Sequence, residues 1–146
     1  MIRVLIADDH PAVRSGLKAI LTKAEDIELV GEAGDGQEAV RLAQQLQPDV
    51  VVLDITMPRL NGFQAIAQLR RVGVATEVVI LSVHNEEALV QQALQHGAVG
   101  YVLKHSSTAE LIQAIRSAQQ GQRFFSSSLR IPSGVIILPN HKPVLG

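Results

Sequence analysis

The chain of 146 residues contains no cysteine and no tryptophan, and aromatic residues make up only 3% of it. Without cysteine the protein can form neither disulfide bonds nor the thiolate sites that bind zinc or iron–sulfur clusters. The formal net charge of −1 gives no indication of a broad surface for nucleic acid or another polyanion. No apolar run approaches the length that crosses a bilayer, and the N-terminus lacks the apolar core of a signal peptide. We therefore expect a cytoplasmic protein, and the length suits a single domain.

Two kinds of segment alternate up to about residue 120. Short apolar runs without a regular in-and-out alternation predict five strands buried on both faces, namely Ile2–Ala7, Ile27–Ala33, Val50–Leu53, Val78–Leu81 and Val99–Leu103. Apolar residues at helical spacing lie between these runs, most weakly in Phe63–Leu69. Pro11 suits the first turn of a helix, and Ser107 and Glu110 are spaced as a capping box. The alternation predicts a flavodoxin-like doubly wound α/β domain with five helices and a five-stranded parallel sheet, for which 2-1-3-4-5 is a common strand order.

The pattern stops after Gly121. The remaining segment has few basic residues, and it is interrupted by three prolines, Pro132, Pro139 and Pro143. This composition predicts a linker or C-terminal tail and argues against a helix-turn-helix domain. We therefore divide the chain into a domain of residues 1–122 and a tail of residues 123–146. The apolar run Val135–Leu138 could pack on the domain or pair with another chain.

Polar residues follow the predicted strands at the points where they end. The first strand is followed by Asp8 and Asp9, the third by Asp54, the fourth ends in Ser82, and the fifth is followed by Lys104. Ligands of doubly wound sheets bind at this carboxyl edge. Three carboxylates would repel one another there unless a cation joined them, and oxygen ligands at an open site suit Mg²⁺. A carboxylate beside Mg²⁺, a hydroxyl and a lysine could accept a phosphoryl group, and Asp54 is the best placed because the third strand is central.

These residues lie in segments that resemble the receiver domain of two-component response regulators. The matching segments are Ile6–Pro11, Asp54–Pro58 with Gly62, Leu81–Ser82 and Gly100–Lys104, in the order and spacing of the family, and they span about residues 1–122. Each motif alone is weak, but together they are highly specific. Further segments look most like the NarL/LuxR-type subfamily, namely Asp9-His10-Pro11, Gly31-Glu32-Ala33 and Gly97–Tyr101.

The resemblance implies a phosphoacceptor site. Asp54 would take a phosphoryl group from the phosphohistidine of a sensor histidine kinase. Mg²⁺ would bind Asp9, Asp54 and the backbone carbonyl of Thr56 directly, and Asp8 through water. Lys104 would contact the phosphoryl oxygens.

The resemblance also implies a switch and not a turnover enzyme. Ser82 and Tyr101 correspond to a switch pair, in which the hydroxyl moves toward the phosphoryl group and the ring turns inward. Thr56 and His84 lie where residues tune the rate of dephosphorylation. Phosphorylation would then change a surface for dimerisation or output, formed by the first and last helices or by the fourth helix and fifth strand. The chain would be the regulatory half of a transcriptional regulator.

One position departs from the receiver pattern. Many receivers have proline in a cis peptide bond after the lysine, whereas His105 follows Lys104 here. Because cis bonds are costly for other residues, the sequence leaves the geometry of this loop open.

The same residues are also consistent with other structures and functions. Asp8 and Asp9 could simply cap a helix, and Tyr101 is as consistent with half-buried packing as with a switch. Asp54-Ile55-Thr56 faintly resembles the nucleophile motif of haloacid dehalogenase phosphohydrolases, but in that family the nucleophilic strand comes first. A pseudo-receiver that works without phosphorylation is also disfavoured, because such proteins usually lack one of the acids or the lysine.

Overall fold

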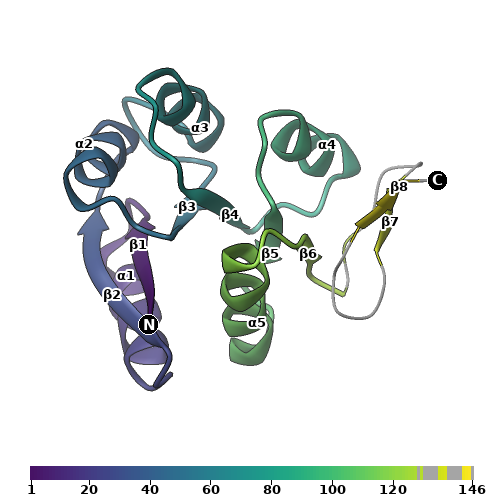
Figure 1. Cartoon of the computed structure of the whole chain (residues 1–146), viewed down its shortest axis with the longest axis horizontal. Coiled ribbons are helices and arrows are strands. Elements are labelled where there is room, and N and C mark those ends of the chain that lie inside the picture. Colours follow the sequence, from purple (N-terminus) through teal and green to yellow (C-terminus); the bar gives the residue numbers. More distant parts are fainter. Residues whose placement is uncertain (128, 130–134, 138–142, 146) are drawn as a thin grey trace.

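The computed structural model describes residues 1–127, 129, 135–137 and 143–145, and it contains a parallel sheet between two helical layers (Figure 1). The strands are β1 (Ile2–Ala7), β2 (Ile27–Ala33), β3 (Val50–Asp54), β4 (Glu77–Ser82), β5 (Gly100–Leu103) and β6 (Phe124–Phe125). They are ordered β2-β1-β3-β4-β5-β6, and every pair is parallel. The predicted flavodoxin-like fold and the order 2-1-3-4-5 are therefore confirmed, and a short sixth strand is added.

Five helices cover the sheet, and all five were expected. They are α1 (Pro11–Thr22), α2 (Gly36–Leu46), α3 (Gly62–Arg71), α4 (Glu87–Gln95) and α5 (Thr108–Gln119). The weakest pattern, that of α3, is supported by a capping box, in which Asn61 and Gln64 exchange hydrogen bonds. In α5 only half of the predicted box forms: Ser107 Oγ accepts from the amide of Glu110, whose carboxylate accepts from Ser127 instead.

The core has two parts, one on each face of the sheet, because successive strand residues point to opposite faces. Leu5 and Leu53 belong to the part that includes residues of α2, α3 and α4. Val4 and Ile6 belong to the part that includes residues of α1 and α5. Burial on both faces explains why the strands showed no alternation in the sequence.

No sequence pattern indicates β6, since its two residues are too few to show a period. Phe124 and Phe125, which the sequence pattern placed in the tail, pair with Gly100 and Tyr101 and are buried. Farther along, β7 (Val135–Ile137) pairs antiparallel with β8 (Pro143–Leu145). Part of the apolar run that could have met another chain is thus paired within this one, and its last residue lies outside the described residues.

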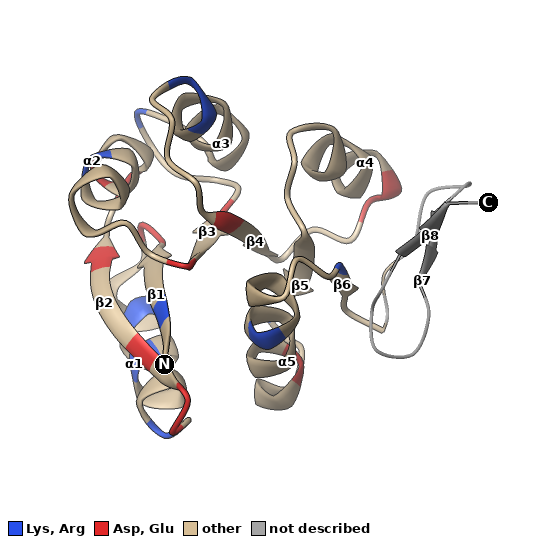
Figure 2. Cartoon of the chain, viewed as in Figure 1, with Lys and Arg blue, Asp and Glu red and all other residues tan. Residues whose placement is uncertain are grey.

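Basic and acidic positions are interspersed over the helices and loops, in keeping with the small net charge (Figure 2). Among the described residues, no helix combines the length and apolar character needed to cross a membrane.

Candidate functional site

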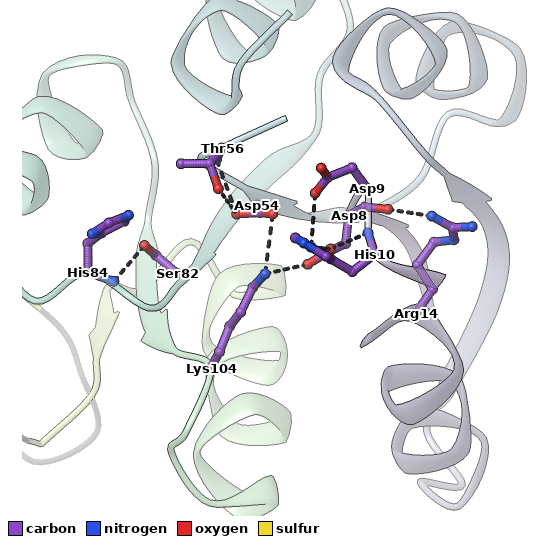
Figure 3. A network of polar contacts seen from close by, with 9 residues as sticks. All are labelled: Asp8, Asp9, His10, Arg14, Asp54, Thr56, Ser82, His84 and Lys104. Atoms are coloured by element: carbon purple, nitrogen blue, oxygen red, sulfur yellow. Dashed lines mark hydrogen bonds and ion pairs between the residues drawn. The ribbon is translucent and has the colours of Figure 1, made fainter. Parts of the chain in front are cut away.

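The register of the parallel strands brings the predicted site residues together at one edge of the sheet (Figure 3). β1 and β3 run in register up to their last residues, so Asp8 and Asp54 lie side by side. On the other flank of β3, Ser82 ends β4 and is paired with the residue that precedes Lys104. Residues from four separate segments therefore share a small volume, as the sequence predicted from strand ends alone.

Lys104 joins the two buried carboxylates. Its Nζ lies 2.8 Å from Asp8 Oδ2 and 3.2 Å from Asp54 Oδ2. Asp8 is fully buried and Asp54 is 2% exposed, so each carboxylate would be costly without a cation. The ammonium lets the fold bury them, and it lies where it could also contact a group attached to Asp54.

The two ionisable partners respond to this packing in different ways. Burial raises the pKa of Asp54, and the charge of Asp8 adds to this, while Lys104 and the amide of Thr56 act against it. Burial alone would lower the pKa of Lys104, but the hydrogen bond and charge of Asp8 and the charge of Asp54 outweigh it and raise the value. Lys104 is therefore firmly protonated, whereas Asp54 sits in a site already rich in negative charge.

The other carboxylate oxygen of Asp54 also accepts a hydrogen bond. Its Oδ1 accepts from the backbone amide of Thr56 at 3.1 Å and lies 3.3 Å from the Thr56 hydroxyl. With Oδ2 turned to Lys104, the carboxylate is fixed in orientation. Thr56 thus lies directly beside the predicted acceptor.

A cluster of four residues can hold a cation. Asp8, Asp9, His10 and Asp54 each offer one ligand atom, and these atoms lie within 4.8 Å of one another. Two buried oxygens, Asp8 Oδ2 and Asp9 Oδ1, accept no hydrogen bond of good geometry from the described residues, although ionisable nitrogens of Lys104 and His10 lie close. Carboxylate oxygens left in this way fit a divalent cation, and the acidic cluster is typical of receiver magnesium sites.

His10 is the residue that sequence reasoning missed. Its Nδ1 lies 3.1 Å from both Asp8 Oδ1 and Asp9 Oδ1, and its amide donates to Asp8 Oδ1 at 2.9 Å. The pattern of strand ends could not single it out, because it lies one residue beyond the two acids that it contacts. The available signal was the run Asp8-Asp9-His10 at the start of a helix. Asp8 and Asp9 do not act as the N-cap of α1, because the N-cap position is His10.

On the other side of the site, neutral hydrogen bonds connect three residues. The amide of His84 donates to Ser82 Oγ at 3.0 Å, and the Tyr101 hydroxyl donates to the carbonyl of His84 at 2.8 Å. Tyr101 is fully buried and belongs to the core part under α4, so it is packed more deeply than the half-buried alternative assumed. Its burial raises the pKa of the phenol. The loop between β4 and α4 is thus tied to both Ser82 and Tyr101.

The loop after β5 has ordinary backbone geometry. None of the described residues has a cis peptide bond, so the bond between Lys104 and His105 is trans. The amide of Lys104 donates to the carbonyl of Ser82 at 2.8 Å, and that of Ser106 to Leu103 at 2.9 Å. Lys104 therefore reaches the carboxylates without the proline seen in many receivers.

The sequence profile described as "Response regulator receiver domain" matches residues 4–116. The chain belongs to the response regulator receiver domain family. It is 39% identical over 126 residues to the nitrate/nitrite response regulator protein NarL of Escherichia coli K12, covering 86% of this chain and 58% of that protein. It is 43% identical over 122 residues to the transcriptional regulatory protein LiaR of Bacillus subtilis, covering 84% and 58%. The chain thus spans less than two thirds of the length of these relatives.

Solved structures agree with this membership. The receiver domain of the putative response regulator NarL from Mycobacterium tuberculosis is similar with a TM-score of 0.80 and 40% identity, covering 83% of this chain and 98% of that one. A LuxR-family response regulator from Aurantimonas sp. SI85-9A1 also has a TM-score of 0.80, at 37% identity, covering 86% and 89%. The resemblance to NarL/LuxR-type receivers is confirmed. This receiver domain is a phosphoacceptor switch rather than a conventional enzyme, which removes the phosphohydrolase alternative.

Proposed function

We propose that Asp54 accepts a phosphoryl group from the phosphohistidine of a sensor histidine kinase. The observation that carries this proposal is the position of Asp54 between Lys104, 3.2 Å from one oxygen, and the amide of Thr56, 3.1 Å from the other. Asp8 is held in a similar way, by the amide of His10 and by Lys104. Asp54 differs in its place, because β3 lies between β1, which leads into Asp8, and β4, which ends in Ser82.

The transfer forms an acyl phosphate. An oxygen of the Asp54 carboxylate attacks phosphorus, and the bond between phosphorus and the imidazole nitrogen of the donor breaks as the new bond forms. Lys104 Nζ offsets the charge on the phosphoryl oxygens, and the Ser82 hydroxyl donates to one of them. Ser82 ends β4 and Lys104 follows β5, and both strands lie on the side of β3 opposite β1, so the two groups approach the phosphoryl group from that side.

The acidic cluster holds Mg²⁺ in this proposal. Asp9, Asp54 and the carbonyl of Thr56 are its direct ligands, and Asp8 binds through water. The buried oxygens without hydrogen bonds support a cation there, and magnesium prefers such oxygen ligands. When bound, Mg²⁺ neutralises charge on the transferring phosphoryl group.

Phosphorylation is read by the loop between β4 and α4. Ser82 must turn its hydroxyl toward the phosphoryl group, and that hydroxyl now accepts from His84. Because Tyr101 donates to the carbonyl of His84, a movement of Ser82 reaches the core under α4. Thr56 lies beside Asp54 and His84 is bonded to Ser82, and in this proposal these two residues set the lifetime of the phosphorylated state.

The partners follow from the family. The kinase supplies the phosphoryl group, and the altered surface supports a homodimer or acts on an output domain. We place the receiver in residues 1–122 and treat residues 123–146 as a linker or C-terminal tail, whose first residues add β6 to the edge of the receiver sheet. Binding to DNA would then require a further C-terminal domain. The lengths of NarL and LiaR support a further domain, as does RcsB, which is 28% identical and for which a solved structure contains two dimers bound to two parallel DNAs.

The test is the intact mass of the chain after incubation with Mg²⁺ and acetyl phosphate, beside the Asp54→Asn variant. We expect one labile phosphoryl adduct that requires Mg²⁺ and is absent from the variant. An adduct that persists in the variant would move the acceptor to another residue. No adduct on the wild-type chain, with a cognate kinase as donor as well, would contradict the proposal.

A further inference from the structure

The segment after α5 returns to the receiver instead of leaving it. After Phe124 and Phe125 extend the sheet as β6, Ser126 is buried, and so is Leu129, which joins the same core part as Tyr101. The amide of Leu129 donates to the carbonyl of Ser126 at 3.0 Å, as in a tight turn. A sequence that resembles a linker is therefore packed against β5 and the loop that follows Lys104.

Ser126 continues the sheet where β6 stops. Its amide donates to the carbonyl of Tyr101 at 3.0 Å, which is the next rung of the parallel ladder. The Ser126 side chain then supplies the following hydrogen bond of the ladder, because Ser126 Oγ accepts from the amide of Leu103 at 3.0 Å. That amide is buried and would otherwise lack a partner at the end of the short strand.

The same hydroxyl also contacts the loop beyond Lys104. Ser126 Oγ lies 2.9 Å from Ser106 Oγ, a hydrogen-bond distance at which either hydroxyl can donate. Since Ser126 also accepts from Leu103, its two side-chain contacts bracket Lys104, one residue before it and two residues after it. Next along the chain, the amide of Ser127 donates to the Glu110 carboxylate at 2.9 Å, which fastens the segment to α5.

We infer that Ser126 is a positioning residue that fixes the backbone carrying Lys104, and through it the place of the ammonium at the phosphoryl site. This inference rests on the proposed phosphoacceptor function. A lysine side chain is long and flexible. The position of the Lys104 ammonium therefore depends on how firmly the Lys104 backbone is fixed. Removing the hydroxyl frees the buried Leu103 amide and releases Ser106 from its contact.

The test compares Ser126→Ala with Ser117→Ala in the full chain. Both serines are 2% exposed, but Ser117 Oγ accepts from the side chain of Gln113 at 3.3 Å within α5 and, among the described residues, forms no side-chain hydrogen bond with the Lys104 loop. The rate of adduct formation with Mg²⁺ and acetyl phosphate is measured at a temperature where every variant is fully folded by circular dichroism. We expect Ser126→Ala to slow it by roughly threefold to tenfold, because misplacement of a catalytic group is costly, and Ser117→Ala to leave it unchanged.

Further variants and a binding measurement distinguish a positioning role of Ser126 from a general loss of stability. Ser106→Ala removes one of the two contacts, so it should slow adduct formation less than Ser126→Ala, and the double variant should be no slower than Ser126→Ala alone. Beryllofluoride affinity should weaken in the same order. If Ser126→Ala fails to fold, a rate unchanged in Ser106→Ala overturns the inference.

Two outcomes are distinguishable. A wild-type chain that is phosphorylated normally, with Ser126→Ala as fast as Ser117→Ala, overturns the role of Ser126 and leaves the phosphoacceptor proposal intact. A wild-type chain that never takes a phosphoryl group overturns the proposed function, and the inference with it.

Discussion

Two groups of residues meet at the carboxyl edge of the sheet and are held in different ways. The acidic group lies at the ends of β1 and β3 and consists of Asp8, Asp9 and Asp54. The neutral group lies on β4, β5 and the loop after β4 and consists of Ser82, His84 and Tyr101. Lys104 holds Asp8 and Asp54 by charge, whereas hydrogen bonds of 2.8 to 3.0 Å connect the residues of the second group.

The difference separates chemistry from response. Substitutions that change charge should alter whether a phosphoryl group is taken up, because the acidic group and its counter-charges carry the transfer. Substitutions in the neutral group should alter how the bound phosphoryl group is sensed or lost.

The largest effect is expected from Lys104→Met, which removes the only cation bridging Asp8 and Asp54 among the described residues. Adduct formation with acetyl phosphate should slow by about 10²-fold, the order found when a positioned charge-stabilising group is removed. Without Mg²⁺ the variant should also lose about 3 kcal/mol of unfolding free energy, because two buried carboxylates lose their partner. Urea unfolding with and without Mg²⁺ would measure this, and Mg²⁺ should restore part of the loss.

The matched control for that prediction is Lys18→Met. Lys18 is an exposed lysine whose ammonium lies 3.8 Å from a Glu32 carboxylate oxygen, and exposed pairs contribute little. Both rate and stability should stay near those of the wild type. Equal rates in the Lys104 and Lys18 variants would mean that charge does not hold the acidic group as described.

The next effect concerns the lifetime of the phosphorylated state. Replacing Thr56 by Ala or His84 by Ala should change the decay rate of phospho-Asp54 several-fold and leave its formation largely intact. Thr56 Oγ1 lies 3.3 Å from the Asp54 carboxylate, and His84 is bonded to Ser82 through its backbone, so both lie close enough to affect water near the phosphoryl group. Adduct decay after removal of acetyl phosphate is the measurement. Unchanged decay in both variants would contradict this role.

The sequence predicted the acidic group better than the neutral group. Asp8 and Asp54 could be placed together because parallel strands end at one edge, and that rule needs only the strand pattern. The role of Tyr101 stayed undecided because the sequence of a strand does not show how deeply the covering helices bury each side chain. The role of Ser126 could not be predicted for another reason, because a serine in a serine-rich run resembles a linker residue. Its hydroxyl accepts from the buried amide of Leu103 because β6 is too short to supply a backbone carbonyl there.

A smaller effect is expected from Tyr101→Phe, which removes one neutral hydrogen bond and keeps the ring. The hydroxyl donates to the carbonyl of His84 at 2.8 Å, so its loss should lower the unfolding free energy by about 1 kcal/mol. The rate of adduct formation should not change, since the hydroxyl has no contact with Asp54. Any difference in self-association between phosphorylated and unphosphorylated forms should shrink, as measured by sedimentation. A variant that slows phosphorylation as strongly as Lys104→Met would break the division between the two groups.

The smallest effect is a pH-dependent gain in stability from Asp54→Asn. The pKa of Asp54 is raised by burial and by Asp8, so the folded protein binds this proton more tightly than the unfolded chain. The contribution of Asp54 to stability is therefore greatest below its unfolded pKa and is lost as pH rises through the folded value. At neutral pH without Mg²⁺ the variant should melt a few degrees above the wild type, and the gain should vanish in acid and shrink when Mg²⁺ is present. Asp26→Asn should behave in the opposite way, because the hydrogen bond from Arg116 lowers the pKa of Asp26. Melting curves that shift in the same direction for both variants would show that burial beside Asp8 does not govern Asp54.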